Sequence, residues 1–214
     1  MAEHVDPKPT APPPNISAAI GGPLGVAETS IPAVAFVIAY TASGSDTNTA
    51  AGVAVALALV LTVARLLRRE SPQHALSGLV GVGFAAFVAT RSGKAENFFL
   101  PGLLLNAAYA SAFLISVAVR WPLVGIIVTK LDGEEGSGWR KDPRRMRAFA
   151  LASWMWAGLF GLRLLVQLPL YFAGAVVALG VAKTAMGLPL FGIGLWLAWL
   201  LVREHRVTKP AAPT

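Results

Sequence analysis

The stretch TAAGVAVALALVLTVARLL, residues 49–67, decides the fold. Its first charged residue is Arg65, and Ala, Val and Leu make up most of what precedes it. About 20 such residues cross the hydrocarbon core of a bilayer as one helix. The stretch is therefore predicted to be a transmembrane helix.

The composition extends this prediction to the whole chain. Of 214 residues, 55% are hydrophobic and only 14% are charged, and the mean hydropathy is +0.62. Soluble domains carry about 25% charged residues, and disordered chains combine low hydrophobicity with high charge, so both classes are excluded. Because cysteine is absent, disulfides, thiolate metal sites and cysteine nucleophiles are excluded as well.

Six segments are predicted to span the membrane: residues 23–42, 49–67, 72–90, 98–119, 147–169 and 187–202. Residues 170–186 are also apolar, but Gly187 and Pro189 separate them from the last span, since proline removes a backbone donor. We expect a short interfacial or re-entrant helix there. The fold predicted is an all-α polytopic membrane protein with a transmembrane domain over residues 23–204.

The two ends of the chain are predicted to be cytoplasmic tails. Residues 1–22 contain five prolines and are expected to be disordered, because they cannot bury enough apolar surface to offset the entropy of ordering. Residues 205–214 form the second tail. The first residues lack the basic and then apolar pattern of a signal peptide, so the first hydrophobic segment is expected to stay in the mature protein.

Basic residues are distributed unequally between the predicted loops. With six spans, 14 lysines and arginines lie on one side and only Arg91 and Lys94 lie on the other. Cytoplasmic loops carry the excess of Lys and Arg, which predicts a bacterial cytoplasmic-membrane protein with both termini inside. Five spans would instead put the N-terminus outside. These loops account for the net charge of +7, and no nucleic-acid partner is expected.

Polar side chains inside the spans predict a ligand-binding site. Arg163, Gln167 and Tyr171 follow one another at intervals of four residues and share one helix face. This face is expected to converge, near the outer side of the membrane, with four further residues: Asn106, Tyr109, Glu96 and Asn97.

Two interpretations of Arg163 stay open. Ionisable groups inside a membrane are costly and usually face protein or water, so Arg163 indicates a site for an anionic or polar solute. Alternatively, Arg163 pairs with Glu96 or Asn106 and only fixes helix packing, because a buried charge pair is weak evidence for function.

Glu28 and His74 form a second candidate pair near the inner ends of their helices. Histidine titrates near neutral pH, so the charge of this pair would change with the pH and make it proton-responsive. The alternative is an interfacial Glu28 and a His74 that caps its helix.

The loop after the fourth span ends in WRKDPRR, residues 139–145. Tryptophan prefers the membrane interface, and a basic cluster suits anionic lipid head groups. The residues predicted to anchor this loop to lipid are Trp139, Arg140, Lys141, Arg144 and Arg145. A protein partner is the alternative.

Sequence signatures of catalysis are missing. HExxH, GxSxG and Walker strings do not occur, and the three histidines are far apart in the sequence. No enzymatic activity, metal or cofactor is therefore expected.

Several strings together resemble one family: GGPLG at 21–25 followed by Glu28, ALSGLVG at 75–81, NFFLPG at 97–102 with Asn106 and Tyr109, WRKDPR at 139–144, and RLLVQLPLY at 163–171. The combination covers about residues 21–204 and resembles the actinobacterial multi-pass membrane family known as domain of unknown function 3159. The resemblance implies location and topology, and it implies no activity. The NFF string, a later asparagine and a tryptophan-containing loop are more weakly similar to intracellular septation protein A.

Two functions are consistent with these patterns. The first is translocation of a small solute, ion or lipid intermediate around Arg163, as a homo-oligomer, because six helices are few for a monomeric carrier. The second is a non-transporting scaffold or assembly factor for envelope or division machinery.

Overall fold

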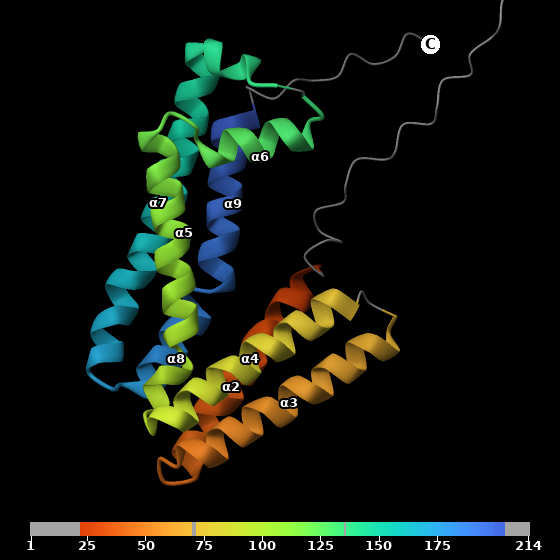
Figure 1. Ribbon diagram of the computed structural model, residues 1–214, viewed down its shortest axis with the longest axis vertical. Helices are drawn as coiled ribbons and strands as arrows, with labels where there is room; N and C mark the ends of the chain where they lie inside the picture. Colours follow the sequence, from red (N-terminus) through yellow and green to blue (C-terminus); the bar gives the residue numbers. More distant parts are fainter. Residues whose placement is uncertain (1–21, 70–71, 135, 204–214) are drawn as a thin grey trace, which may run out of the picture.

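The computed structural model describes residues 22–69, 72–134 and 136–203, and within these ranges the chain forms helices and no strand. The long helices are α2 (Gly22–Ala42), α3 (Thr47–Leu67), α4 (Pro72–Ser92), α5 (Leu100–Ala118), α7 (Pro143–Phe172) and α9 (Leu188–Val202) (Figure 1). The short ones are η1 (Ala95–Phe98), α6 (Leu123–Leu131), η2 (Gly138–Lys141) and α8 (Val176–Ala185). The prediction of an all-α protein is confirmed.

Five segments are long and apolar enough to cross a membrane: Thr47–Leu67, Ala75–Ser92, Leu100–Ala118, Pro143–Phe172 and Val176–Val202. The last of them comprises α8 and α9 together. The apolar part of α2, Ser30–Ala42, is shorter. The chain is therefore a membrane protein, and a sixth span through α2 stays a prediction.

The long helices alternate in direction between two ends of the structure. In Figure 1, α2, α4 and α7 run toward η1 and α8, whereas α3, α5 and α9 run away from them. Gly22 and Arg203, where the described chain begins and ends, therefore lie on the same side, as six spans would require. We call this side the basic end, because the loops after α3 and α5 and the end of α9 carry most of the described lysines and arginines.

The helices form two groups, which meet around η1 and α8. One group consists of α2, α3 and α4, and the other of α5, α7 and α9 (Figure 1). Where they meet, Phe36, Phe98, Phe99 and Leu179 are at most 2% exposed. The rings of Phe36 and Phe98 stack with their centroids 4.0 Å apart. We call this aromatic contact the junction.

Helix α6 is the element that the sequence analysis missed. It lies in the stretch predicted to be a loop, and in Figure 1 it runs across the ends of α5 and α9. Two serine hydroxyls cap its first turn: Ser116 Oγ accepts from Leu123 N at 3.2 Å, and Ser153 Oγ accepts from Val124 N at 3.2 Å. Nine residues are too few for hydropathy alone to distinguish a short helix from an apolar loop.

The short helix predicted within residues 170–186 is present as α8, after α7 has continued through Pro169 to Phe172. The two predicted tails fall almost entirely outside the described residues. Only Gly22 is described, as the first residue of α2.

We predict that Gly180→Ala destabilises the contact between α8 and α2. A Cβ atom at position 180 would lie 2.3 Å from Val37 Cγ2, which is closer than two carbon atoms can approach. The expected result is a lower melting temperature of the purified protein in detergent. The control is Gly78→Ala, because a Cβ there meets nothing within 4 Å and alanine favours helix over glycine by up to about 1 kcal/mol. Equal melting temperatures for both variants would contradict this packing.

Candidate functional site

The last apolar segment is interrupted in its middle. Helix α8 ends at Ala185 and α9 begins at Leu188, with Met186 and Gly187 between them. The carbonyl oxygen of Gly187 accepts a hydrogen bond from Phe191 N at 3.2 Å and another from Arg163 Nη2 at 2.7 Å. The interruption thus gives a guanidinium on α7 a backbone acceptor on the neighbouring segment. We call it the α8–α9 break.

No carboxylate among the described residues balances the charge of Arg163. Its guanidinium donates to a neutral carbonyl, its Nε is buried without a hydrogen-bond partner, and its Cζ lies 5.9 Å from the centroid of the Phe160 ring. The predicted pairing with Glu96 or Asn106 is not formed, because the guanidinium is held by Gly187 instead. Arg163 therefore brings an uncompensated positive charge to the break.

Lys183 adds a second positive charge one helical turn before the break. Its Nζ lies 5.5 Å from the centroid of the Phe99 ring and 5.9 Å from that of Phe98. Aromatic faces attract cations but carry no net charge. Lys183 was not predicted as part of the site, although a lysine within an apolar segment was the signal that could have identified it.

Three more of the predicted residues belong to the same region. Tyr171 donates a hydrogen bond from its hydroxyl to Asn97 Oδ1, and Asn97 Nδ2 donates to Ser92 Oγ at 2.8 Å. This chain of bonds ties α7 and η1 to the end of α4. Gln167, on the same face of α7, is only 4% exposed.

The other predicted residues are less directly connected to Arg163. Tyr109 is half exposed and its ring centroid lies 5.2 Å from that of Phe160. Asn106 and Glu96 are partly buried. No hydrogen bond or ion pair joins these three described residues to Arg163.

Aromatic side chains fill the bundle between Arg163 and the basic end. Trp156 lies with its ring centroid 5.9 Å from Phe160, 6.2 Å from Phe113 and 5.2 Å from Phe191. These four rings, from α5, α7 and α9, are called the aromatic layer. A polar path from Arg163 to the basic end would have to pass through it.

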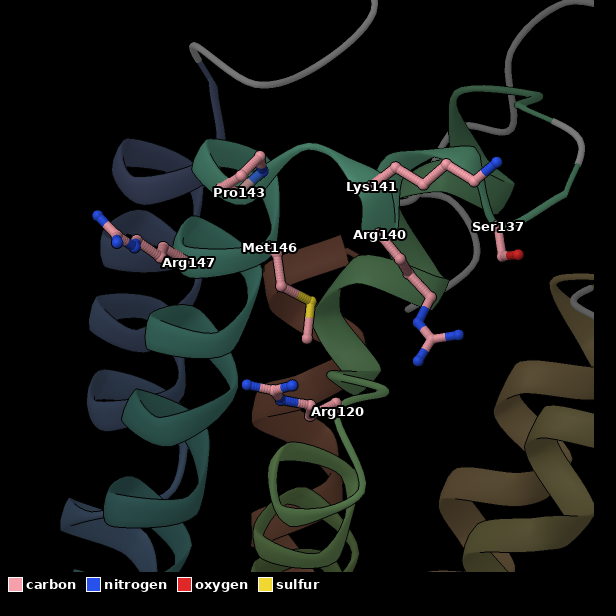
Figure 2. A pocket seen from close by; sticks show the side chains of 7 residues that line it. All are labelled: Arg120, Ser137, Arg140, Lys141, Pro143, Met146 and Arg147. Atoms are coloured by element: carbon pink, nitrogen blue, oxygen red, sulfur yellow. The ribbon is translucent and has the colours of Figure 1, made fainter.

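A second candidate site, the basic pocket, lies at the basic end. It has a volume of about 570 Å³ and is lined by Arg120, Ser137, Arg140, Lys141, Pro143, Met146 and Arg147. In Figure 2 Met146 lies between the cationic residues, with Arg120 below it, while Arg147 and Lys141 extend toward opposite sides. Arg140 and Lys141 were among the predicted anchors, whereas Arg120 and Arg147 were not, because only the fold brings them to the same place.

The position of Trp139 corrects one prediction. Its side chain is 2% exposed, and its ring centroid lies 5.3 Å from that of Phe149. A Cβ at Gly125 would be 2.8 Å from the Trp139 ring, so glycine is what allows this close approach. Trp139 therefore belongs to the core and is not an interfacial anchor. Trp121, 42% exposed, is the tryptophan at the surface of this region.

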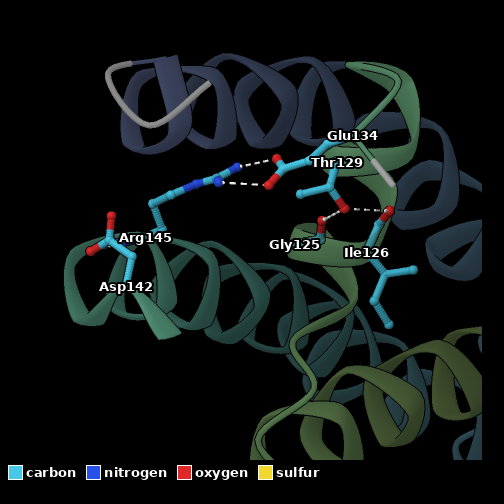
Figure 3. A network of polar contacts seen from close by, with 6 residues as sticks. All are labelled: Gly125, Ile126, Thr129, Glu134, Asp142 and Arg145. Carbon is cyan, nitrogen blue, oxygen red and sulfur yellow. Dashed lines mark hydrogen bonds and ion pairs between the residues drawn. The ribbon is translucent and has the colours of Figure 1, made fainter. Parts of the chain in front are cut away.

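The two remaining anchor residues differ from each other. Arg145 forms an ion pair with Glu134, with Nη2 2.6 Å from Oε2 and Nη1 2.9 Å from Oε1 (Figure 3). Arg144 is exposed. Asp142 accepts from the backbone nitrogens of both and caps the start of α7. The side chain of Arg145 thus has an ion-pair partner within the protein, whereas the side chain of Arg144 is exposed.

Glu28 and His74 lie on α2 and α4, but their side chains are outside the described part of the structure. Among the described residues, no three His, Asp or Glu side chains lie close enough together to hold a metal ion.

A family model described as "Protein of unknown function (DUF3159)" matches residues 20–209. The chain therefore belongs to this family, as the sequence strings predicted. No curated protein and no solved structure matches the chain. The actinobacterial origin and the similarity to septation protein A stay predictions.

The ion pair at the start of α7 predicts a pH dependence. The hydrogen bond from Arg145 holds the pKa of Glu134 below its ordinary value of 4.5. An acid whose pKa is lower in the folded state stabilises that state above its unfolded pKa and loses this contribution as the pH falls through the folded pKa. We expect the melting temperature of the wild type to fall more steeply below about pH 4.5 than that of Glu134→Gln. Parallel curves for the two proteins would contradict this role.

Proposed function

We propose that the protein moves a small anionic solute or an anionic lipid intermediate across the membrane, with Arg163 as its contact. The observation that carries this proposal is the guanidinium at the α8–α9 break, which has a neutral carbonyl as its acceptor and no carboxylate partner among the described residues. Charged groups inside a membrane usually mark a solute or ion pathway. A bound anion would supply the charge that Arg163 lacks.

The length of α9 supports a membrane-embedded position for the break. Its 15 residues rise about 22 Å at 1.5 Å per residue, whereas the hydrocarbon core is about 30 Å thick. With Val202 at the inner boundary, the break lies about 8 Å inside the outer boundary. Arg163 and Lys183 would then meet a solute inside the outer part of the membrane.

Interrupted helices are a recurrent feature of transporter binding sites, because they expose backbone groups at membrane depth. Irregular backbone at that depth is tolerated where it lines a cavity or is buried in protein. The α8–α9 break would be a site of this kind, and Gln167, Tyr171 and Asn97 would add neutral hydrogen-bonding groups to it.

The aromatic layer supports a carrier rather than an open channel. Its rings separate Arg163 from the basic end, so a solute would need a rearrangement of α7 and α9 to pass.

This proposal needs no catalytic step. It includes a bacterial cytoplasmic membrane as the location, both termini in the cytoplasm, and a homo-oligomer as the working unit.

A scaffold or assembly factor is the second candidate function. It is favoured by the exposed basic side chains at the basic end, where Lys141, Arg144 and Arg147 are all accessible. Under this proposal Arg163 serves only to tie α7 to the α8–α9 break, and residues 139–145 recruit the partner.

We predict that Arg163→Gln abolishes transport while the protein stays folded. The experiment reconstitutes the full chain in liposomes and measures chloride flux, phosphate flux and the inversion of a fluorescent phosphatidylglycerol between leaflets. At least one of these is expected to exceed the protein-free rate and to fall at least tenfold in Arg163→Gln. Arg163→Lys is expected to keep part of the rate, because it keeps the charge. The control is Arg91→Gln, at the opposite end from the basic pocket.

Two results would contradict transport. One is the absence of flux above the protein-free rate for all three probes. The other is a loss of flux in Arg163→Gln that follows only from a lower melting temperature. The second result, together with loss of a cross-linked partner in variants of residues 139–145, would favour the scaffold.

A further inference from the structure

We infer that the basic pocket binds the phosphate of an anionic lipid from the leaflet at the basic end. This inference is independent of the proposed transport. It rests on the charge, the shape and the location of the pocket.

The charged side chains among the described lining residues of the pocket are all positive. Arg120, Arg140, Lys141 and Arg147 line it, and none of its described lining residues is acidic. Two of the described carboxylates near the pocket in the sequence have other contacts: Glu134 pairs with Arg145, and Asp142 caps α7. Four cations that surround one hollow repel each other, and a bound anion would relieve this repulsion.

Arg140 is held in place before any ligand binds. Its guanidinium lies over the Trp121 ring, with Cζ 4.0 Å from the ring centroid, and its Nε is buried without a hydrogen-bond partner. Stacking on an aromatic face fixes the plane of a guanidinium and leaves its edge free to donate. Arginine donors arranged in this way match the oxygens of a phosphate.

Arg120 reaches the pocket from the turn between α5 and α6. Its φ is +58°, in the left-handed region that side chains other than glycine rarely adopt. The hydrogen bond from Trp121 N to Ser116 O, at 2.8 Å, holds this turn. Arg120 therefore occupies a turn position that glycine would adopt more easily.

The surroundings of the pocket favour a lipid over a free ion. The volume of about 570 Å³ is that of a site for a whole small molecule, much larger than one phosphate needs. Met146 and Pro143 supply apolar lining beside the charges. Next to the pocket, Trp121, Ile127 and Val119 expose 42%, 50% and 57% of their surfaces, as expected where α6 rests on the acyl chains.

The test measures lipid binding to the detergent-purified full chain. A phosphatidylglycerol with a fluorescent acyl chain is titrated and then displaced with unlabelled lipids. We expect displacement by phosphatidylglycerol and not by phosphatidylcholine at the same concentration, and weaker binding at high salt. Arg140→Gln, Lys141→Gln and Arg120→Gly are each expected to raise the dissociation constant about fivefold.

The controls separate loss of binding from loss of folding. Arg91→Gln, at the other end of the structure, is expected to bind as the wild type does. Lys141 is exposed, so Lys141→Gln is expected to keep the melting temperature of the wild type, and its binding decides the question even where Arg140→Gln unfolds.

Three outcomes would overturn the inference. Equal displacement by phosphatidylcholine would mean that the charges do not select the lipid. Displacement by millimolar inorganic phosphate alone would assign the pocket to a soluble anion, and stronger displacement by an acidic peptide would assign it to a protein partner. Unchanged affinity in Lys141→Gln and Arg120→Gly would exclude the pocket as the binding site.

Discussion

A guanidinium inside an apolar bundle needs an acceptor, and the arrangement of α7, α8 and α9 depends on how Arg163 obtains one. In an unbroken helix each carbonyl points along the axis toward its own hydrogen-bond donor. At the α8–α9 break the carbonyl of Gly187 accepts from Phe191 N, as the first carbonyl of α9, and it accepts a second hydrogen bond from Arg163 Nη2. The same contact joins α7 to the start of α9. The interruption of the last apolar segment and the charge on α7 are therefore two parts of one feature.

The long helices could be predicted from hydropathy, because lipid requires extended apolar segments and leaves few alternatives to a helix. The observed bounds of α3 and α4 differ from the predicted ones by at most two residues. Helix α6 escaped prediction because its nine residues carry no comparable signal. Its position is decided by Ser116 and Ser153, which lie far from each other in the sequence.

The candidate site was predicted less completely. A residue type indicates how costly its side chain is to place inside a membrane, but it does not indicate which group that side chain will bond to. Arg163 was identified by its charge, yet its acceptor is a backbone carbonyl 24 residues away, which no side-chain pattern reveals. Trp139 was placed at the interface from the general preference of tryptophan. The absence of a side chain at Gly125 allowed it to enter the core instead. The basic pocket combines residues from the α5–α6 turn, η2 and α7, so it exists only in the folded chain.

The junction has a mechanical consequence. The group of α2, α3 and α4 contacts the rest of the protein chiefly at one end, around Phe36 and Phe98. Its helices extend away from this contact. A helix of 21 residues such as α3 is about 30 Å long. A rotation of about 10° at the pivot would displace the far tip by about 5 Å, comparable to one helical turn. A small change in aromatic packing at the junction would therefore move the far ends of these helices much further than the junction itself.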